Sequence, residues 1–186
     1  MRIVDLRGQD KRTVRQAAEL LVEGFRDEAP EAWPTLKAAL AEVNDALDDE
    51  RVCRVALGDD NSVLGWVGAI PEYNGRAWEL HPIVVKPGKQ GQGVGKALTQ
   101  DLEEQVRQRG AHTLYLGTDD ESQRTSLSNV DLYENTWERI RTVKNLRRHP
   151  YEFFQKMGFT IVGVVPDANG PDKPDILMAK RVGGAR

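Results

Sequence analysis

Cysteine, histidine and long hydrophobic runs are all scarce in this sequence. Its 186 residues include one cysteine, Cys53, so no disulfide bond can form within the chain, which suits a reducing cytoplasm. The three histidines and the cysteine do not cluster as metal ligands do, so we expect no metal. The longest apolar runs, such as residues 83–85, are far shorter than the roughly 20 residues of a membrane-spanning helix. Residues 1–14 lack the apolar core of a secretory signal, so the sequence predicts a cytoplasmic protein without a membrane partner.

Basic residues are not in excess either. The 26 lysines and arginines stand against 29 aspartates and glutamates, which gives a formal net charge of −3. Proteins that bind nucleic acids present basic faces, so we expect no nucleic-acid partner. Acidic residues concentrate in the segments 23–33, 41–50 and 117–123. Each segment alone is typical of solvated surface, whereas several of them at one site would indicate a cationic ligand.

Length and composition are those of a globular protein, and we expect a single domain over residues 1–186. Apolar alternation and turn residues predict strands at 2–6, 51–57, 62–70, 76–85, 112–118, 160–165 and 175–182. Helical spacing of apolar residues predicts helices at 13–25, 33–47, 96–110, 129–146 and 149–159. This order lacks the regular alternation of doubly wound folds, so the sequence predicts an α+β domain with a mixed sheet.

Four glycines lie between a predicted strand and a predicted helix in VVKPGKQGQGVGKAL, residues 84–98. The first N–H groups of a helix have no partner within it, and glycine lets a phosphate approach them closely. We interpret Gly88, Gly91, Gly93 and Gly95 as part of a phosphate-binding loop. A Walker A loop is excluded because Ala97 stands where that motif needs serine or threonine, and the glycine spacing is not that of a Rossmann loop.

The spacing Gln90-x-x-Gly93-x-Gly95, preceded by Val85-x-Pro87, resembles the coenzyme A pyrophosphate loop of the GNAT (Gcn5-related N-acetyltransferase) superfamily. The resemblance implies a mostly antiparallel central sheet, splayed at the coenzyme A strand and flanked by helices, with acetyl-CoA as cosubstrate and no metal. It also implies a homodimer formed through C-terminal strands. The residues that it places at coenzyme A are Ile83, Val84, Val85, Gln90, Gly91, Gln92, Gly93, Val94, Gly95, Lys96 and Phe154.

Longer segments resemble one branch of that superfamily, the aminoglycoside 6′-N-acetyltransferases. These segments are IPEYNGRAWELHPIVV, LYLGTDDE, NLRRHPYEFFQKMGF, IVGVVPDANG and DKPDILMAK, which cover most of residues 69–180. The resemblance implies direct transfer of the acetyl group from acetyl-CoA to the 6′-amine of an aminoglycoside antibiotic, with a carboxylate as general base. It therefore also implies a role in resistance to such antibiotics.

Glu79 and His81 are the catalytic candidates. Glu79 belongs to the Trp-Glu-Leu-His stretch, and the resemblance makes it the leading general base. Independently, residues two apart on a strand point to the same face, so this pair could orient an amine and take its proton, directly or through water. The alternative is a buried Glu–His pair that holds the strand end. An N–H group near Val84 is expected to polarise the oxyanion.

The resemblance also places Trp33, Tyr73, Glu79, Asp119 and Asp120 at the acceptor. Carboxylates form charge-assisted hydrogen bonds with the ammonium groups of an aminoglycoside, and aromatic rings offer flat surfaces to its sugars. Taken alone, Asp119 and Asp120 are typical of a solvated turn, and Trp33 is typical of a core.

Phe154 departs from the family pattern. Many family members have a tyrosine at this position, whose hydroxyl serves the leaving thiolate, and phenylalanine keeps the ring without the donor. We expect slower chemistry with activity retained, because water can protonate a thiolate whose pKa is about 8.5. Two alternatives stay open: acetyl transfer to another cationic amine (a polyamine, a metabolite or a protein lysine), and a coenzyme A-binding module without efficient catalysis.

Overall fold

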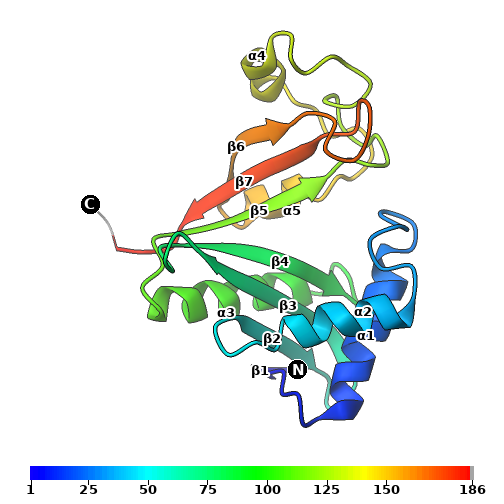
Figure 1. Ribbon diagram of the computed structural model, residues 1–186, viewed down its shortest axis with the longest axis vertical. Coiled ribbons are helices and arrows are strands. Elements are labelled where there is room, and N and C mark those ends of the chain that lie inside the picture. The colour runs from blue at the N-terminus through cyan, green and yellow to red at the C-terminus, as the bar shows by residue number, and fades with distance from the viewer. Residues whose placement is uncertain (185–186) are drawn as a thin grey trace. The chain divides into compact units, whose positions relative to one another are not determined.

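The computed structural model describes residues 1–184, which form two compact units (Figure 1). Unit 1 consists of residues 1–114 and the C-terminal segment from residue 181, and unit 2 consists of residues 115–180. The predicted order of elements is confirmed: β1 (Arg2–Asp5), α1 (Lys11–Phe25), α2 (Leu36–Asp45), β2 (Val52–Leu57), β3 (Val63–Glu72), β4 (Ala77–Val85), α3 (Val94–Gln108), β5 (Thr113–Asp119), α4 (Thr136–Arg141), α5 (Tyr151–Lys156), β6 (Thr160–Val165) and β7 (Asp175–Arg181).

The predicted α+β class with a mostly antiparallel sheet is confirmed. In unit 1 the strands β1, β2, β3 and β4 pair antiparallel in chain order, and in unit 2 β6 pairs antiparallel with β7. The splaying expected at residues 83–85 concerns both units and stays a prediction, as does the single domain over residues 1–186.

The helices of unit 1 cover both faces of its sheet (Figure 1). Neighbouring residues of a strand face opposite sides, and β3 shows which helix lies on which side. Trp66 donates its indole N–H to the carbonyl of Ala17 on α1 over 3.2 Å. A Cβ built on the preceding residue, Gly65, would lie 3.1 Å from Leu98 of α3. Helices α1 and α2 therefore cover one face and α3 covers the other.

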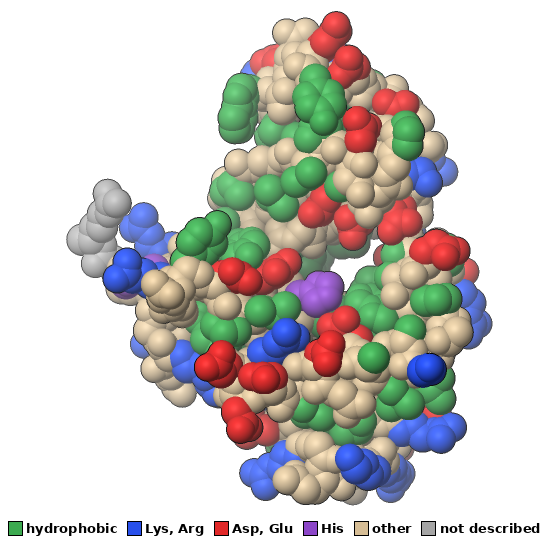
Figure 2. All heavy atoms as spheres, viewed as in Figure 1, with side chains coloured by type: hydrophobic (Ala, Val, Ile, Leu, Met, Phe, Trp, Pro, Cys, Tyr) green, Lys and Arg blue, Asp and Glu red, His purple; other side chains and the backbone are tan. Residues whose placement is uncertain are grey.

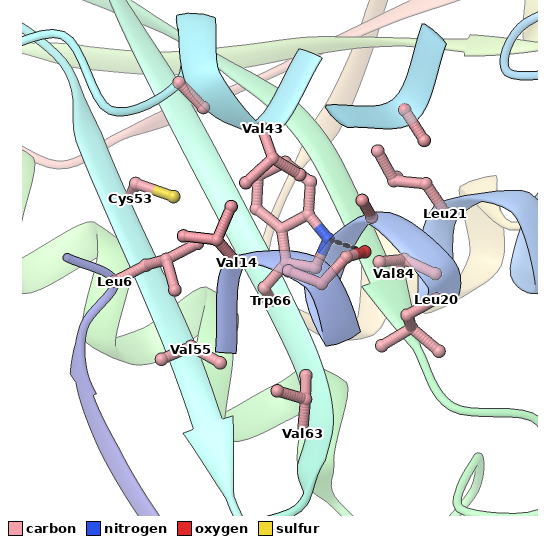
Figure 3. Packing of buried hydrophobic residues seen from close by; sticks show 14 of the residues in the cluster. Leu6, Val14, Leu20, Leu21, Val43, Cys53, Val55, Val63, Trp66 and Val84 are labelled. Carbon is pink, nitrogen blue, oxygen red and sulfur yellow. Dashed lines mark hydrogen bonds between the residues drawn. The ribbon is translucent and has the colours of Figure 1, made fainter. Parts of the chain in front are cut away.

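The core of unit 1 surrounds Trp66 (Figure 3). The fully buried indole lies among aliphatic side chains that include Leu21 of α1, Val43 of α2 and Val84 of β4. Full burial of each of these aliphatic side chains contributes about 1.5–3 kcal/mol to the stability of the fold. Helix α1 approaches β4 closely at Gly24, where a Cβ would lie 2.5 Å from Cγ2 of Val84. Core packing therefore fixes the position of β4, the strand that the sequence predicts to bind coenzyme A.

A largely buried arginine holds α3 against the sheet. The side chain of Arg54 on β2 is 11% exposed and pairs with Asp101 of α3, with Nε–Oδ2 at 2.6 Å and Nη2–Oδ1 at 3.1 Å. Its Nη1 donates to Asp5 of β1. Burial favours a lower pKa for Arg54, but the two carboxylates outweigh burial and raise this pKa, so the guanidinium stays charged. Charge as well as packing thus fixes the helix that follows the glycine-rich loop.

Unit 2 has its own core. One helix predicted in this unit is shorter in the structure than expected. Leu116, Phe159 and Ile176 are buried there, but the helix expected over residues 129–146 is reduced to α4, Thr136–Arg141. Asn135, with φ of 57°, adopts a left-handed conformation that interrupts a helix. The side chain of Trp137 is 74% exposed, so the apolar spacing that suggested a long helix does not form a buried face.

Candidate functional site

Glu79 and His81 lie on the same face of β4, as their spacing predicts. Along this strand partly exposed residues alternate with buried ones, and both side chains belong to the partly exposed set while Leu80 between them is buried. A carboxylate and an imidazole that open to one side can contact the same amine.

His81 lies between an aromatic ring and a carboxylate. The ring centroid of Trp33, in the segment before α2, is 6.1 Å from that of His81, and Trp33 also packs edge-on against Phe25 at 4.7 Å. Oε1 of Glu42 on α2 lies 3.6 Å from Nε2 of His81. The structure therefore brings two predicted residues together and adds Glu42. Glu42 carries no separate signal in the sequence, because a glutamate in a helix with other acidic residues is typical of a solvated face.

A bulge in β4 shapes the strand at His81. The register between β3 and β4 shifts between Val67 and Ala69, so that Gly68 lies opposite His81 and Pro82. The peptide bond between His81 and Pro82 is cis. A Cβ at Gly68 would lie 2.5 Å from the carbonyl oxygen of His81. Because only glycine permits this approach, a residue of β3 determines where the backbone of His81 lies.

Beyond the bulge, the backbone of β4 offers hydrogen-bonding groups at alternate residues. The N–H of Lys86 donates to the carbonyl of Leu64 over 2.8 Å, and bonded pairs alternate with non-bonded pairs along an antiparallel ladder. Val84 is two residues from Lys86, so its N–H and C=O turn toward β3, while those of Ile83 and Val85 turn away from β3. A pantetheine arm along β4 would therefore meet the backbone of Ile83 and Val85, and Val84 contributes its side chain to the core.

The loop between β4 and α3 presents a row of backbone N–H groups without an acceptor. Within residues 1–184, no backbone or side-chain oxygen accepts a hydrogen bond from the amides of residues 91–96. Gly93 is the N-cap of α3, so no side chain caps the helix, and its first turn carries no acidic residue. Free amides and the positive end of the helix dipole attract an anion. The geometry fits the pyrophosphate of coenzyme A.

The glycines of this loop leave room in front of the amides. Gly91 and Gly93 have φ of 73° and 88°, and nothing lies within 4 Å of a Cβ built on either residue. The loop is braced from within, because the side-chain amide of Gln92 donates to the carbonyl of Gly88 over 2.9 Å and that of Gln90 to the carbonyl of Val85 over 3.5 Å. Among the other loop residues predicted to hold coenzyme A, Lys96 is exposed and Val94 is buried. These contacts brace the loop that carries the free amides.

Tyr73 occupies the turn between β3 and β4. Its φ is 51°, and the N–H of Gly75 donates to the carbonyl of Glu72 over 3.0 Å to close the turn. The side chain of Tyr73 is 75% exposed, so its ring is available to a sugar. Its contact with the acceptor stays a prediction.

In unit 2, Asp119 at the end of β5 and Asp120 directly after it have different surroundings. Asp119 is exposed, and its Oδ1 accepts from the side-chain amide of Asn169 over 2.5 Å. Nδ1 of His149 accepts from the N–H of Tyr151, so Nε2 carries the proton and donates to the carbonyl of Asp119 over 3.1 Å. Asp119 is therefore anchored while its carboxylate remains exposed, and its contact with the acceptor stays a prediction.

Asp120 is fully buried, which excludes for this residue the alternative of a solvated turn. Its Oδ1 accepts from the N–H of Arg124, and its Oδ2 accepts from the N–H of Thr125 at 2.9 Å and from the hydroxyls of Thr125 and Ser128 at 2.7 and 2.5 Å. Burial favours a higher pKa for this carboxyl, but the hydrogen bonds outweigh burial and hold its pKa below the ordinary value. Asp120 thus orders the loop after β5, and a contact with substrate stays a prediction.

Replacing Asp120 by asparagine is expected to lower the free energy of unfolding by about 2–4 kcal/mol, because an amide nitrogen would face donors that now bind a carboxylate. The depressed pKa makes this stabilisation complete above the unfolded pKa of about 3.9 and lost as pH falls through the folded value. Urea unfolding from pH 7 down to pH 3 measures both effects, and the difference from the wild type should shrink below about pH 4. The matched control is Asp119→Asn, which removes the same charge from an exposed neighbour. Equal stability of the two variants would contradict the role given to Asp120.

Phe154 lies in the core of unit 2. It is 4% exposed, and its ring centroid is 5.1 Å from that of Phe153 and 5.7 Å from that of Phe159. This packing accounts for an aromatic residue at the position, and its contact with the pantetheine arm stays a prediction.

Cys53 is a buried residue of β2. Burial, reinforced by the charge of Asp5, raises the pKa of Cys53 to about 12. The thiolate is the nucleophilic form of cysteine. An acetyl-cysteine intermediate is therefore disfavoured, which supports direct transfer.

Across residues 1–184, no helix has the length and apolar character to cross a membrane. The same residues include no group of three or more His, Cys, Asp or Glu side chains that could hold a metal ion.

Comparisons with known proteins concern the family and the fold of this chain. Residues 17–135, which extend over parts of both units, match the model of the acetyltransferase (GNAT) family. A solved structure of an aminoglycoside 6′-N-acetyltransferase complexed with coenzyme A is 39% identical, with a TM-score of 0.91 and coverage of 100% of this chain and 99% of that one. An aminoglycoside 6′-N-acetyltransferase from Enterococcus faecium is also 39% identical, with a TM-score of 0.89 and the same coverage. An aminoglycoside 6′-acetyltransferase type Ii is 33% identical, with a TM-score of 0.75 and full coverage of both chains. The search of curated proteins found no match.

Proposed function

The chain belongs to the acetyltransferase (GNAT) family, and from this premise we propose that it transfers the acetyl group of acetyl-CoA to the 6′-amine of aminoglycoside antibiotics. The observation that carries the proposal is the row of unpaired amides over residues 91–96, at the start of α3 and directly after the strand that holds Glu79 and His81. Similarity over the full chain to aminoglycoside 6′-N-acetyltransferases supports the choice of acceptor.

In the proposed reaction, the pyrophosphate lies on these amides and the pantetheine arm follows β4 along Ile83 and Val85. Glu79 accepts a proton from the 6′-ammonium, directly or through water. The neutral amine forms a bond with the thioester carbon, and an N–H of β4 that points away from β3 stabilises the oxyanion. The carbon–sulfur bond then breaks, and the thiolate takes a proton from water or from the new amide nitrogen.

Several features favour a polycationic acceptor. Trp33 and the exposed Tyr73 offer aromatic surface in unit 1, and the exposed carboxylate of Asp119 lies in unit 2. Figure 2 shows acidic side chains on the surface of each unit. Carboxylates gain charge-assisted hydrogen bonds with ammonium groups, which an aminoglycoside carries in number.

The first test is the release of coenzyme A thiol with kanamycin, which has a 6′-amine, and with paromomycin, which has a 6′-hydroxyl instead. The proposal predicts turnover with kanamycin and none with paromomycin. Equal turnover with both would contradict the 6′ position. Turnover with a polyamine or a peptide lysine alone would favour another cationic acceptor, and coenzyme A binding without turnover on any amine would favour a binding module.

A second copy of this chain is the protein partner that we propose, in line with the dimerisation that the family resemblance implies. Val162 and Val165 on β6 are 52% and 44% exposed, which leaves apolar surface on a C-terminal strand. Light scattering should give about twice the chain mass of 20.8 kDa, and a monomer at micromolar concentration would contradict the dimer. We place the enzyme in the cytoplasm, where the single buried thiol needs no oxidising environment, and expect no nucleic-acid or membrane partner.

A further inference from the structure

Glu42 has an unfavourable place in its helix. Helix α2 ends at Asp45 and has no basic residue in its last turn. The carboxylates of Glu42 and Asp45 therefore lie near the negative end of the helix dipole. The side chain of Glu42 is only 22% exposed. A largely covered carboxylate in such a place breaks a local rule of helix stability, and such exceptions are expected at functional positions.

Among residues 1–184, the one basic side chain within ion-pair distance of the Glu42 carboxylate is that of His81. Oε1 of Glu42 faces Nε2 of His81 at 3.6 Å, which is longer than a direct hydrogen bond and within ion-pair distance. His81 is 41% exposed, so the other side of its ring remains accessible.

We propose that Glu42 is a positioning residue for acetyl transfer and acts through His81. With Nε2 facing the carboxylate, the neutral ring keeps its proton on Nε2, and the lone pair of Nδ1 is left for the acceptor amine or for the water beside it. This inference deepens the proposed function and rests on it.

The surroundings of His81 explain how the carboxylate of Glu42 on α2 can position its ring. Trp33 lies beside the ring with 6.1 Å between centroids, and the bulge opposite Gly68 fixes the backbone from which the ring projects. Glu42 supplies the contact that sets the rotation of the ring between these two. The ring then shares its face of β4 with Glu79, the proposed base.

The test compares Glu42→Gln with Asp45→Asn in the kanamycin assay. Both variants remove one carboxylate from the end of α2, and Asp45 is exposed and, within residues 1–184, forms no ion pair with His81. We expect Glu42→Gln to lower kcat about 10-fold, a part of the roughly 10²–10⁴-fold that an acid–base residue contributes, with the KM values for kanamycin and acetyl-CoA nearly unchanged. Asp45→Asn should behave as the wild type.

A double-mutant cycle shows whether Glu42 acts through His81. If it does, the double variant Glu42→Gln/His81→Asn is no slower than His81→Asn alone. Full additivity of the two effects would overturn the proposal. So would a higher KM for kanamycin at unchanged kcat, which would indicate direct binding of the acceptor, or wild-type kinetics of Glu42→Gln.

The result that would overturn the proposed function differs from the result that would overturn this inference alone. A wild-type chain that releases no thiol with kanamycin would overturn that function, and this inference with it. A wild-type chain that acetylates kanamycin while Glu42→Gln matches Asp45→Asn would overturn this inference alone. Melting temperatures of all variants accompany the kinetics, so that loss of folded protein is not counted as loss of kcat.

Discussion

Replacing Glu79 by glutamine is expected to lower kcat about 100-fold, near the lower end of the 10²–10⁴-fold that general acid–base catalysis contributes. The variant keeps the size of the side chain and the pairing of residue 79 with Ile70 of β3, so the strand is retained. It loses the group that takes a proton from the acceptor ammonium. The KM for acetyl-CoA should not change, because the loop of residues 91–96 is untouched. Thiol release with kanamycin at saturating acetyl-CoA measures the effect.

The matched control for this prediction is Glu23→Gln. Glu23 is an exposed carboxylate of α1 in the same unit, so its replacement changes the net charge equally. Retention of more than half of the wild-type kcat by Glu79→Gln would exclude Glu79 as the general base. The role would then pass to His81 or to water.

Replacing Gly93 by alanine is expected to raise the KM for acetyl-CoA by about 10- to 100-fold, which corresponds to about 1.4–2.8 kcal/mol of binding free energy. Nothing within 4 Å would contact the added methyl group, so it would occupy open space next to the unpaired amides of this loop. Its φ of 88° also disfavours any side chain, and a shift of Gly93 would move the first turn of α3. Titration of coenzyme A by calorimetry measures the loss directly.

Gly110→Ala is the control for strain. Gly110 follows the other end of α3 with φ of 85°, and nothing lies within 4 Å of its built Cβ either. Both variants therefore carry the same backbone penalty, of order 1–2 kcal/mol for a left-handed residue. If Gly110→Ala weakens coenzyme A binding as much as Gly93→Ala, the effect is on stability and the loop is not the pyrophosphate site.

The order of the elements could be predicted from the sequence because apolar periodicity and glycine or proline boundaries are local properties. The local nature of these signals also explains why the helix predicted over residues 129–146 is wrong in its length. Trp137, Ile140 and Val143 recur at helical spacing, yet Asn135 just before them adopts positive φ and Trp137 is exposed. Periodicity records which residues are apolar, whereas the length of a helix also depends on what packs against it.

For the candidate site, the glycine loop and the shared face of Glu79 and His81 follow from spacing alone. The burial of Asp120 does not, because its partners Thr125 and Ser128 are polar residues that are equally common in solvated loops. Glu42 was missed for a related reason. Its contact joins α2 to β4, and a contact between elements so far apart in the chain leaves no pattern in the sequence.

The buried cysteine has a consequence for how this enzyme withstands its own product. Each turnover releases a free thiol, and oxidised coenzyme A exchanges with protein thiolates to form mixed disulfides. With a pKa of about 12, the only thiol of the chain offers almost no thiolate to that exchange at physiological pH. The folded protein should therefore resist modification by coenzyme A disulfide and remain active in storage without a reducing agent. The redox-sensitive thiol in the reaction is then that of the released coenzyme A.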